Sequence, residues 1–260
     1  MRILISNDDG YEALGVQVLA RIMAGFGDVS VVAPKYHQSG MSAAVSLVHK
    51  SLASKELPEK GPGRWYYLDA TPASCVKFGL EFLYENRNPD LVVCGINHGS
   101  NASSAANYSG TLGATAEGAI NGCKSIAVSL CDHRPDADFS VIEAFLPGIV
   151  RKLLDNWPEN RYGLYYNINF PSLPLESVKG IRVGRQGRGW WVKEFEHSEI
   201  PPEELEAGEK AWVMRGVFVD AASSEEADHR LNNEGWISIT PCSIDLTDHE
   251  EADRLAGIDF

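Results

Sequence analysis

The stretch RILISNDDGYEALGVQVLARIMAGFGDVSVVA, from Arg2 to Ala33, contains the pattern from which the fold class is predicted. Arg2–Ser6 is short and mostly apolar, as a buried strand is, and Asp28–Ala33 has the same character. Between them, Gly15–Phe26 repeats its apolar residues at the spacing of an amphipathic helix. The order strand, helix, strand predicts a βαβ unit with parallel strands.

The same alternation continues through the first half of the chain. Thr71-Pro72 has the residue types of a helix N-cap and first helical position, and predicts a helix to about Tyr84. Asp90–Ile96 (DLVVCGI) is apolar almost throughout, as a central parallel strand covered on both faces is. Strands at Arg64–Leu68 and Lys124–Leu130 and a helix at Thr111–Asn121 complete the pattern. We therefore predict an α/β protein with a three-layer, Rossmann-like, doubly wound sheet.

The pattern changes after about residue 180. Trp212–Asp220 and Gly235–Thr240 alternate like strands, but the helices between strands are lost. We expect one domain over residues 1–260, with a C-terminal β-hairpin excursion at about 180–234 that makes an oligomer contact, and a last strand that returns to the main sheet. The basic and aromatic stretch from Arg182 to Lys193 could alternatively bind single-stranded nucleic acid.

Composition limits the partners of this chain. It has 260 residues, 44% of them hydrophobic and 23% charged, as ordinary globular proteins do. Its formal net charge of -13 disfavours long nucleic acids and anionic membrane surfaces. A small anionic substrate remains compatible, because one bound divalent cation can reverse the potential inside a pocket. The apolar run Ile3–Ile5 is too short for a signal peptide, so we expect a cytoplasmic location.

Polar segments follow several of the predicted strands. In open α/β sheets, ligands bind where the loops at the carboxyl ends of the strands converge. That rule selects Asn7–Gly10 (NDDG), Gln38–Ser42 (QSGMS), Gly95–Asn101 (GINHGSN) and Tyr108–Thr111 (YSGT). We expect these four loops to form one site.

The adjacent carboxylates of Asp8 and Asp9 are the main candidate for chemistry. Two carboxylates at the end of a buried strand repel each other, and a hard divalent cation would relieve that repulsion. Serine hydroxyls and asparagine carbonyl oxygens from neighbouring loops could complete its coordination. Alternatively, either aspartate could cap a helix or stabilise a turn. Tyr108–Thr111 precedes a helix whose positive end could hold a phosphate, or it could simply supply the helix cap.

Together these segments resemble the SurE family of 5'-nucleotidases. The resemblance rests on Ile3–Gly10 (ILISNDDG), Ala33-Pro34, Gln38–Ser42, Thr71–Ala73 (TPA), Gly95–Asn101, Tyr108–Ala114 (YSGTLGA), Asn167–Pro171 (NINFP) and Gly235–Pro241 (GWISITP). It implies a Rossmann-like core, and nucleoside 5'-monophosphates as substrates, with 3'-nucleotides and short polyphosphate as further ones. It also implies a homodimer or homotetramer that exchanges C-terminal elements.

The resemblance also implies a set of site residues. One divalent metal cation, Mg²⁺ or Mn²⁺, would be held by Asp8, Asp9, Ser39 and Asn97. Phosphate contacts would come from Asn101, Ser109, Gly110 and Thr111. We hypothesise that the cation binds a phosphate oxygen and activates a water, with Asp8 and Asp9 as the catalytic pair. No general acid is assigned, although His98 is close in sequence.

Two other hypotheses for the function of the acidic pair remain open. A carboxylate could attack phosphorus directly, as in aspartyl-phosphate enzymes, although these usually have Asp-x-Asp. The chain could instead be a receiver-like phosphoacceptor or a nucleotide-binding module. In a receiver-like module the acidic pair would hold magnesium beside a phosphoacceptor, and Asp69, which follows a later strand, is the candidate for that residue. Catalytic release of phosphate distinguishes an enzyme from both kinds of binding module.

Overall fold

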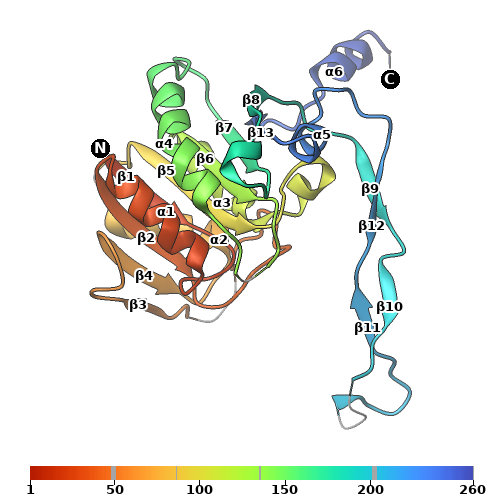
Figure 1. The fold of residues 1–260 in the computed structure, drawn as a ribbon, viewed down its shortest axis with the longest axis horizontal. Coiled ribbons are helices and arrows are strands. Elements are labelled where there is room, and N and C mark those ends of the chain that lie inside the picture. The colour runs from red at the N-terminus through yellow and green to blue at the C-terminus, as the bar shows by residue number, and fades with distance from the viewer. Residues whose placement is uncertain (48–50, 86, 135, 201–203, 260) are drawn as a thin grey trace.

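The computed structural model describes residues 1–47, 51–85, 87–134, 136–200 and 204–259. Its main sheet consists of β1 (Arg2–Ser6), β2 (Asp28–Pro34), β3 (Ser54–Glu56), β4 (Arg64–Leu68), β5 (Leu91–His98), β6 (Ser125–Leu130), β7 (Leu164–Phe170), β8 (Gly180–Val183) and β13 (Trp236–Ser243). Within the described residues the strand order is β3-β4-β2-β1-β5-β6-β7-β13-β8 (Figure 1). The strands from β4 to β7 in this order are parallel to one another, whereas β3 and β13 run antiparallel to β4 and β7.

Helices cover both faces of this sheet. Ile3 and Ile5 of β1 pack in a core cluster with α1 (Leu14–Ala24) and α4 (Ser140–Asp155). Leu4 points to the other face, where it packs with α2 (Pro72–Phe78) and α3 (Gly110–Ile120). Alternate residues of a strand face opposite sides of a sheet, so a strand that is apolar throughout supplies both cores. The predicted three-layer α/β fold is confirmed.

The predicted helix from Thr71 begins as the sequence indicated. The Thr71 hydroxyl accepts a hydrogen bond from the Ser74 N–H, and Pro72 occupies the first helical position, where a missing N–H costs nothing. After Phe78 the chain continues as a π-helical turn, η1 (Gly79–Leu83), which brings Tyr84 to the sheet. The shorter elements are η2 (Ser103–Asn107), η3 (Leu175–Ser177), α5 (Asp228–Asn233), which packs on β13, and α6 (His249–Ala256).

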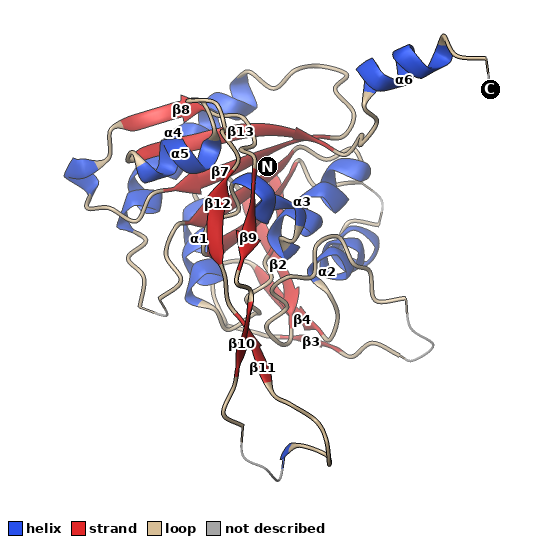
Figure 2. Ribbon diagram, turned by 90° about the vertical axis from the view of Figure 1, so that its right-hand side faces the viewer, coloured by secondary structure: helices blue, strands red, loops and turns tan. Residues whose placement is uncertain are grey.

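A long two-stranded ribbon leaves the body between β8 and α5 (Figures 1 and 2). Its inner part pairs β9 (Gly189–Val192) with β12 (Val217–Asp220), and its outer part pairs β10 (Phe195–His197) with β11 (Trp212–Met214). The chain then returns to the main sheet as β13, antiparallel to β7, which confirms the predicted return of the last strand. None of the helices in the described ranges is long and apolar enough to span a bilayer.

Candidate active site

Asp8 and Asp9 lie in a tight turn at the carboxyl end of β1. The turn is closed by a 2.9 Å hydrogen bond from the Asn7 side-chain amide to the Gly10 carbonyl oxygen. Gly10 has a φ of 97°, a left-handed conformation that glycine adopts without a side-chain clash. The Gln38 N–H donates to the Asp8 carbonyl oxygen at 2.7 Å, so the loop after β2 is fixed directly to this turn. The sequence therefore builds a rigid acidic turn rather than a flexible one.

Asp8 is almost completely buried, with 3% of its surface exposed. Burial raises the pKa of its carboxyl group from 3.8 to about 6, because a charged group loses its hydration there. Thr111 opposes this shift, since its hydroxyl donates a hydrogen bond to Asp8 Oδ1 and favours the ionised form. The neighbouring Asp9 raises the pKa of Asp8 further by charge repulsion. An ionised Asp8 is therefore held at a free-energy cost.

Asp9 is more accessible than Asp8 and faces the end of β5. The backbone N–H of His98 lies 3.3 Å from Asp9 Oδ2, and His37 Nδ1 lies 3.4 Å from Asp9 Oδ1. Burial raises the pKa of Asp9 as well, while the contact with the His98 N–H opposes the rise. Two carboxylates whose charges are both disfavoured thus share one turn, and a cation between them would relieve both costs.

The two other predicted ligands lie on the adjoining loops. Asn97 is near the end of β5, 7% exposed, and its amide nitrogen donates to the Gly99 carbonyl oxygen at 2.7 Å. That bond leaves the amide oxygen of Asn97 for a ligand. Ser39 is exposed and directly follows Gln38, the residue bonded to the Asp8 carbonyl.

Carboxylate, hydroxyl and amide oxygens are hard ligands that suit Mg²⁺ or Mn²⁺. The predicted set of two carboxylates, one hydroxyl and one amide oxygen is of this kind, so its chemistry fits such a cation. In the part of the chain that the structure describes, no three His, Cys, Asp or Glu residues gather as a metal-binding cluster. The oxygen-rich set would therefore depend on Ser39 and Asn97 as well as on the aspartates.

The first turn of α3 packs directly on Asp8. A Cβ added to Gly110 would lie 2.9 Å from Asp8 Cβ, so only glycine fits this contact without a shift. The Ser109 hydroxyl accepts from the Leu112 N–H at 3.1 Å and caps the helix, the alternative role that the sequence left open. The Thr111 hydroxyl is engaged by Asp8. The free N–H groups of the first helical turn are therefore the donors through which this segment would bind a phosphate.

Asn101, a predicted phosphate contact, is held in a buried amide network. Its backbone N–H donates to Asn169 Oδ1 at 2.8 Å, and its side-chain nitrogen donates to Ser129 Oγ at 2.9 Å. Its carbonyl oxygen accepts from Asn167 Nδ2 at 2.8 Å. The segment Asn167–Pro171 at the end of β7, two strands from β5, therefore supports the loop after β5. Asn101 is as much a structural residue as a candidate ligand contact.

Two features of the site were not predicted from the sequence. His37 lies beside Asp9, and its position just after the second strand is the signal that could have found it. The loops that contain Ser39 and Ser109 are also joined: Ser42 donates to the Tyr108 carbonyl through its N–H at 3.0 Å and to the Asn107 carbonyl through its hydroxyl at 2.8 Å.

His98, by contrast, reaches Asp9 only through its backbone. Its ring packs edge-on against Phe139, with the centroids 5.3 Å apart, and its Nδ1 is 3.1 Å from the Arg134 carbonyl oxygen.

Known proteins resemble this chain over most of its length. Residues 3–193, which include every candidate site residue, match the family described as Survival protein SurE. The chain belongs to the SurE family. The 5'-nucleotidase SurE of Cytophaga hutchinsonii is 38% identical over 254 residues, which cover 97% of this chain and 95% of that protein. The 5'-nucleotidase SurE of Phocaeicola vulgatus is 37% identical over 245 residues, covering 94% and 91%. The crystal structure of the SurE protein from Aquifex aeolicus matches with a TM-score of 0.81 at 31% identity, and covers 98% of each chain.

Proposed function

We propose that this protein is a metal-dependent phosphatase that hydrolyses nucleoside 5'-monophosphates to nucleoside and phosphate. The observation that carries the proposal is the buried Asp8 beside Asp9, at the convergence of the loops that define the family resemblance. Its relatives are named 5'-nucleotidase SurE over nearly the whole chain length, which supports the same substrate class. Neither aspartate caps the following helix α1, whose N-cap residue is Ala13 and which has no side-chain cap hydrogen bond.

In this proposal Asp8, Asp9, Ser39 and Asn97 hold one Mg²⁺ or Mn²⁺. A bound cation supplies stabilisation of the negative charge on the phosphate and a lowered pKa for an attacking water. The Asp8 carboxylate suits the role of fixed ligand, because the Thr111 hydroxyl orients one of its oxygens. Oriented ligands reduce the reorganisation that the reaction requires.

The remaining steps belong to the protein's own groups. The N–H groups at the start of α3 bind phosphate oxygens, next to Asp8, at the positive end of that helix. Asp9 is the more open of the two carboxylates and orients the attacking water. His37 Nδ1, 3.4 Å from Asp9 Oδ1, gives a proton released at Asp9 a route to bulk solvent, because the His37 side chain is 63% exposed.

The same proposal includes several further points. Additional substrates are 3'-nucleotides and short polyphosphate. We also propose that the protein acts in the cytoplasm as a homodimer or homotetramer. The ribbon from β9 to β12 supports an oligomer contact, because Trp190 is 54% and Trp212 is 52% exposed. Large apolar side chains exposed together commonly mark protein contacts.

A phosphate-release screen over nucleoside monophosphates tests this function. Purified protein is assayed after treatment with a chelator and again after addition of Mg²⁺ or Mn²⁺. We expect many turnovers per chain on 5'-monophosphates with metal, and activity at background level without it. Uptake of a single equivalent of phosphate from a small phosphodonor would instead favour a receiver-like phosphoacceptor. Full activity in the chelator would refute the role of the cation.

A further inference from the structure

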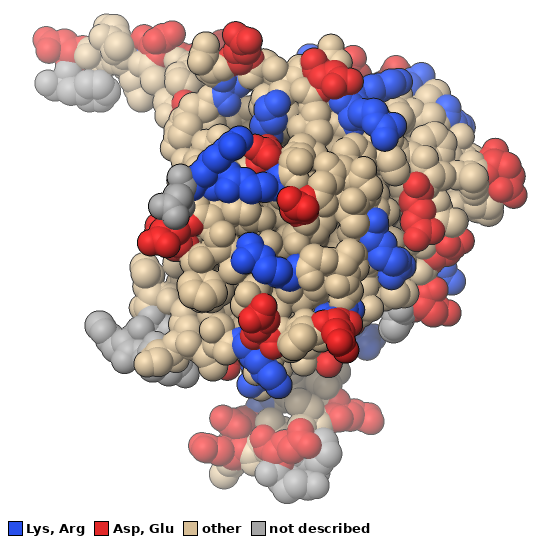
Figure 3. All heavy atoms as spheres, turned by 90° about the vertical axis from the view of Figure 1, so that its left-hand side faces the viewer, with Lys and Arg blue, Asp and Glu red and all other residues tan. Residues whose placement is uncertain are grey.

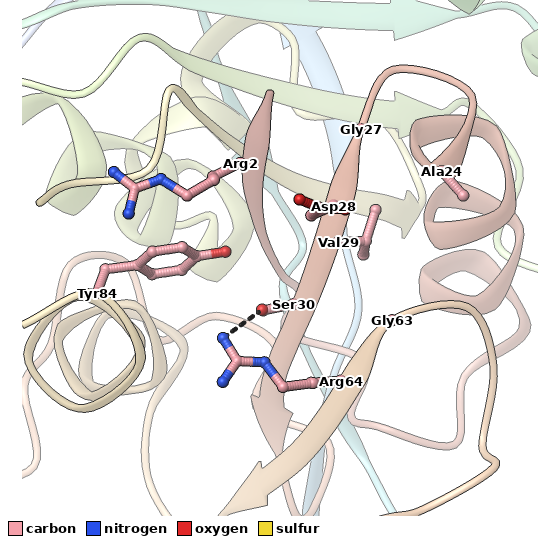
Figure 4. Close-up of a pocket in the computed structure, with 9 residues that line it drawn as sticks. All are labelled: Arg2, Ala24, Gly27, Asp28, Val29, Ser30, Gly63, Arg64 and Tyr84. Carbon is pink, nitrogen blue, oxygen red and sulfur yellow. Dashed lines mark hydrogen bonds between the residues drawn. The ribbon is translucent and has the colours of Figure 1, made fainter.

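A second polar pocket lies at the opposite end of the sheet from Asp8 and Asp9. It is formed at the amino ends of β1, β2 and β4 and has a volume of about 450 Å³. Figure 4 shows the side chains that line it. This volume is within the range of about 300–1,000 Å³ that is typical of small-molecule sites. We infer that this pocket binds a small phosphate monoester that carries hydroxyl groups, such as a nucleotide or a sugar phosphate.

Strand register places the polar residues of the pocket on one face of the sheet. Arg2 of β1 pairs with Asp28 of β2, and Ser30, two residues further along, pairs with Arg64 of β4. Residues paired across strands, and residues two apart along a strand, share a face. Tyr84, which follows η1, covers this face, and its hydroxyl donates to the Ile3 carbonyl oxygen at 3.1 Å. The arrangement is therefore set by the fold and not by flexible surface side chains alone.

The pocket contains two arginines without acidic partners. Among the described residues, no carboxylate oxygen lies within ion-pair distance of the guanidinium group of Arg2 or Arg64, although Asp90 Oδ2 accepts a hydrogen bond from the Arg2 backbone N–H at 2.7 Å. Arg2 Nη2 donates to the Asn88 carbonyl at 2.8 Å, and Arg64 Nη2 lies 3.4 Å from Ser30 Oγ. Each guanidinium group has five N–H donors, so most remain for a ligand. The planar donor fork of arginine matches the oxygens of a phosphate group.

Buried hydroxyls form the floor between these arginines. Ser30 is 3% and Tyr84 5% exposed, and the Arg2 guanidinium lies over the Tyr84 ring at 5.6 Å from its centroid. In Figure 4, Arg2 and Arg64 lie on opposite sides of the Tyr84 side chain. On the face of the molecule drawn in Figure 3, Lys and Arg side chains are interspersed with Asp and Glu, and the chain as a whole has a net charge of -13. The two guanidinium groups in the pocket, and not the surface around it, therefore favour an anion.

Asp28 narrows the class of ligand. Its side chain lies on the same face as the arginines and carries the opposite charge, so the pocket holds two positive charges and one negative charge. A carboxylate repels a second phosphate group but accepts hydrogen bonds from hydroxyls. A phosphate monoester with a hydroxylated substituent satisfies both the arginines and Asp28. Inorganic phosphate satisfies only the arginines, and a polyphosphate is repelled by Asp28.

Titration calorimetry with chelator-treated protein tests this inference. Adenosine 5'-monophosphate and inorganic phosphate are titrated separately into the wild type and into Arg64→Gln, Arg2→Gln, Asp28→Asn and Arg161→Gln. Arg161 is a matched control, because it is exposed and lies in the loop before β7, at the same edge of the sheet but three strands beyond β1. Thermal unfolding of each variant verifies that it is folded. Crystals soaked in adenosine 5'-monophosphate locate the bound molecule.

We expect Arg64→Gln and Arg2→Gln to lower the affinity for adenosine 5'-monophosphate about tenfold or more at one of its binding sites, as loss of a charged hydrogen bond does. Arg161→Gln should bind like the wild type. Asp28→Asn should weaken the nucleotide while leaving or improving the affinity for inorganic phosphate. The inference fails if both arginine variants bind as Arg161→Gln does, or if the soaked crystals show the nucleotide only beside Asp8. Stronger binding of both probes by Asp28→Asn would refute the monoester assignment. The inference does not depend on hydrolysis, so it can hold or fail independently of the proposed function.

Discussion

Replacing Asp8 with asparagine should abolish phosphatase activity and at the same time stabilise the metal-free protein at pH 8. The folded protein holds the Asp8 proton more tightly than the unfolded chain, because its pKa is raised from 3.8 to about 6. Each pKa unit corresponds to about 1.36 kcal/mol, so ionised Asp8 costs the fold about 3 kcal/mol above pH 6. The cost is absent at low pH and grows as the pH rises from about 4 to 6. Asparagine has nearly the same shape, stays neutral, and can still accept the Thr111 hydrogen bond.

Urea unfolding in a chelator measures this directly. Asp8→Asn should exceed the wild type by up to about 3 kcal/mol at pH 8 and by about half of that at pH 5, where folded Asp8 is mostly protonated. Asp253→Asn on the exposed helix α6 serves as the control for removal of a negative charge. Added Mn²⁺ should stabilise the wild type but not Asp8→Asn. A stability gain that is absent, or that does not change between pH 5 and pH 8, would refute the burial argument.

Substitutions at three further positions test the surroundings of Asp8. Thr111→Val removes the hydrogen bond that lowers the pKa of Asp8, so the acidic limb of the kcat/KM profile should move to higher pH, and Thr111→Ser should restore it. Gly110→Ala places a Cβ 2.9 Å from Asp8 Cβ, and should lower kcat at least about tenfold while circular dichroism shows a folded protein. Asn97→Ala should weaken Mn²⁺ binding about tenfold or more in a metal titration, whereas Asn97→Asp should retain it. Unchanged Mn²⁺ affinity in Asn97→Ala would remove that residue from the ligand set.

Much of the fold could be predicted because its signals are local. The helix beginning at Thr71-Pro72 is set by its own first turn, and the apolar run of β5 reports burial on both faces. The convergence of the four loops followed from a general rule about the carboxyl ends of parallel strands. The contact of Asp8 with the loop after β2, through the Gln38 N–H, is the physical form of that convergence.

Other features depend on contacts between distant residues and could not be read from the sequence. The phosphate contact of Thr111 stays a prediction, but the hydrogen bond from its hydroxyl to Asp8, 103 residues away in the chain, could not be foreseen. Nor does a sequence give the depth of a side chain, so the raised pKa of Asp8 could not be foreseen. The pocket of Arg2 and Arg64 arises because β2 lies between β1 and β4, an order that strand patterns alone do not specify.

The two aspartates are adjacent in sequence, but the fold gives them different surroundings. Asp8 packs against the first turn of α3 and is sealed by Gly110 and Thr111, whereas Asp9 faces the end of β5 and the exposed His37. Burial makes Asp8 a costly anion, and a cation that neutralises it recovers that cost as binding energy. The accessibility of Asp9 lets the same turn exchange water and protons with solvent. In the proposed mechanism, a single buried carboxylate would bind the cation without this exchange, and a single exposed one would lack the energetic reason to bind it. The proposal therefore assigns hydrolysis to this turn because it joins two unlike carboxylates.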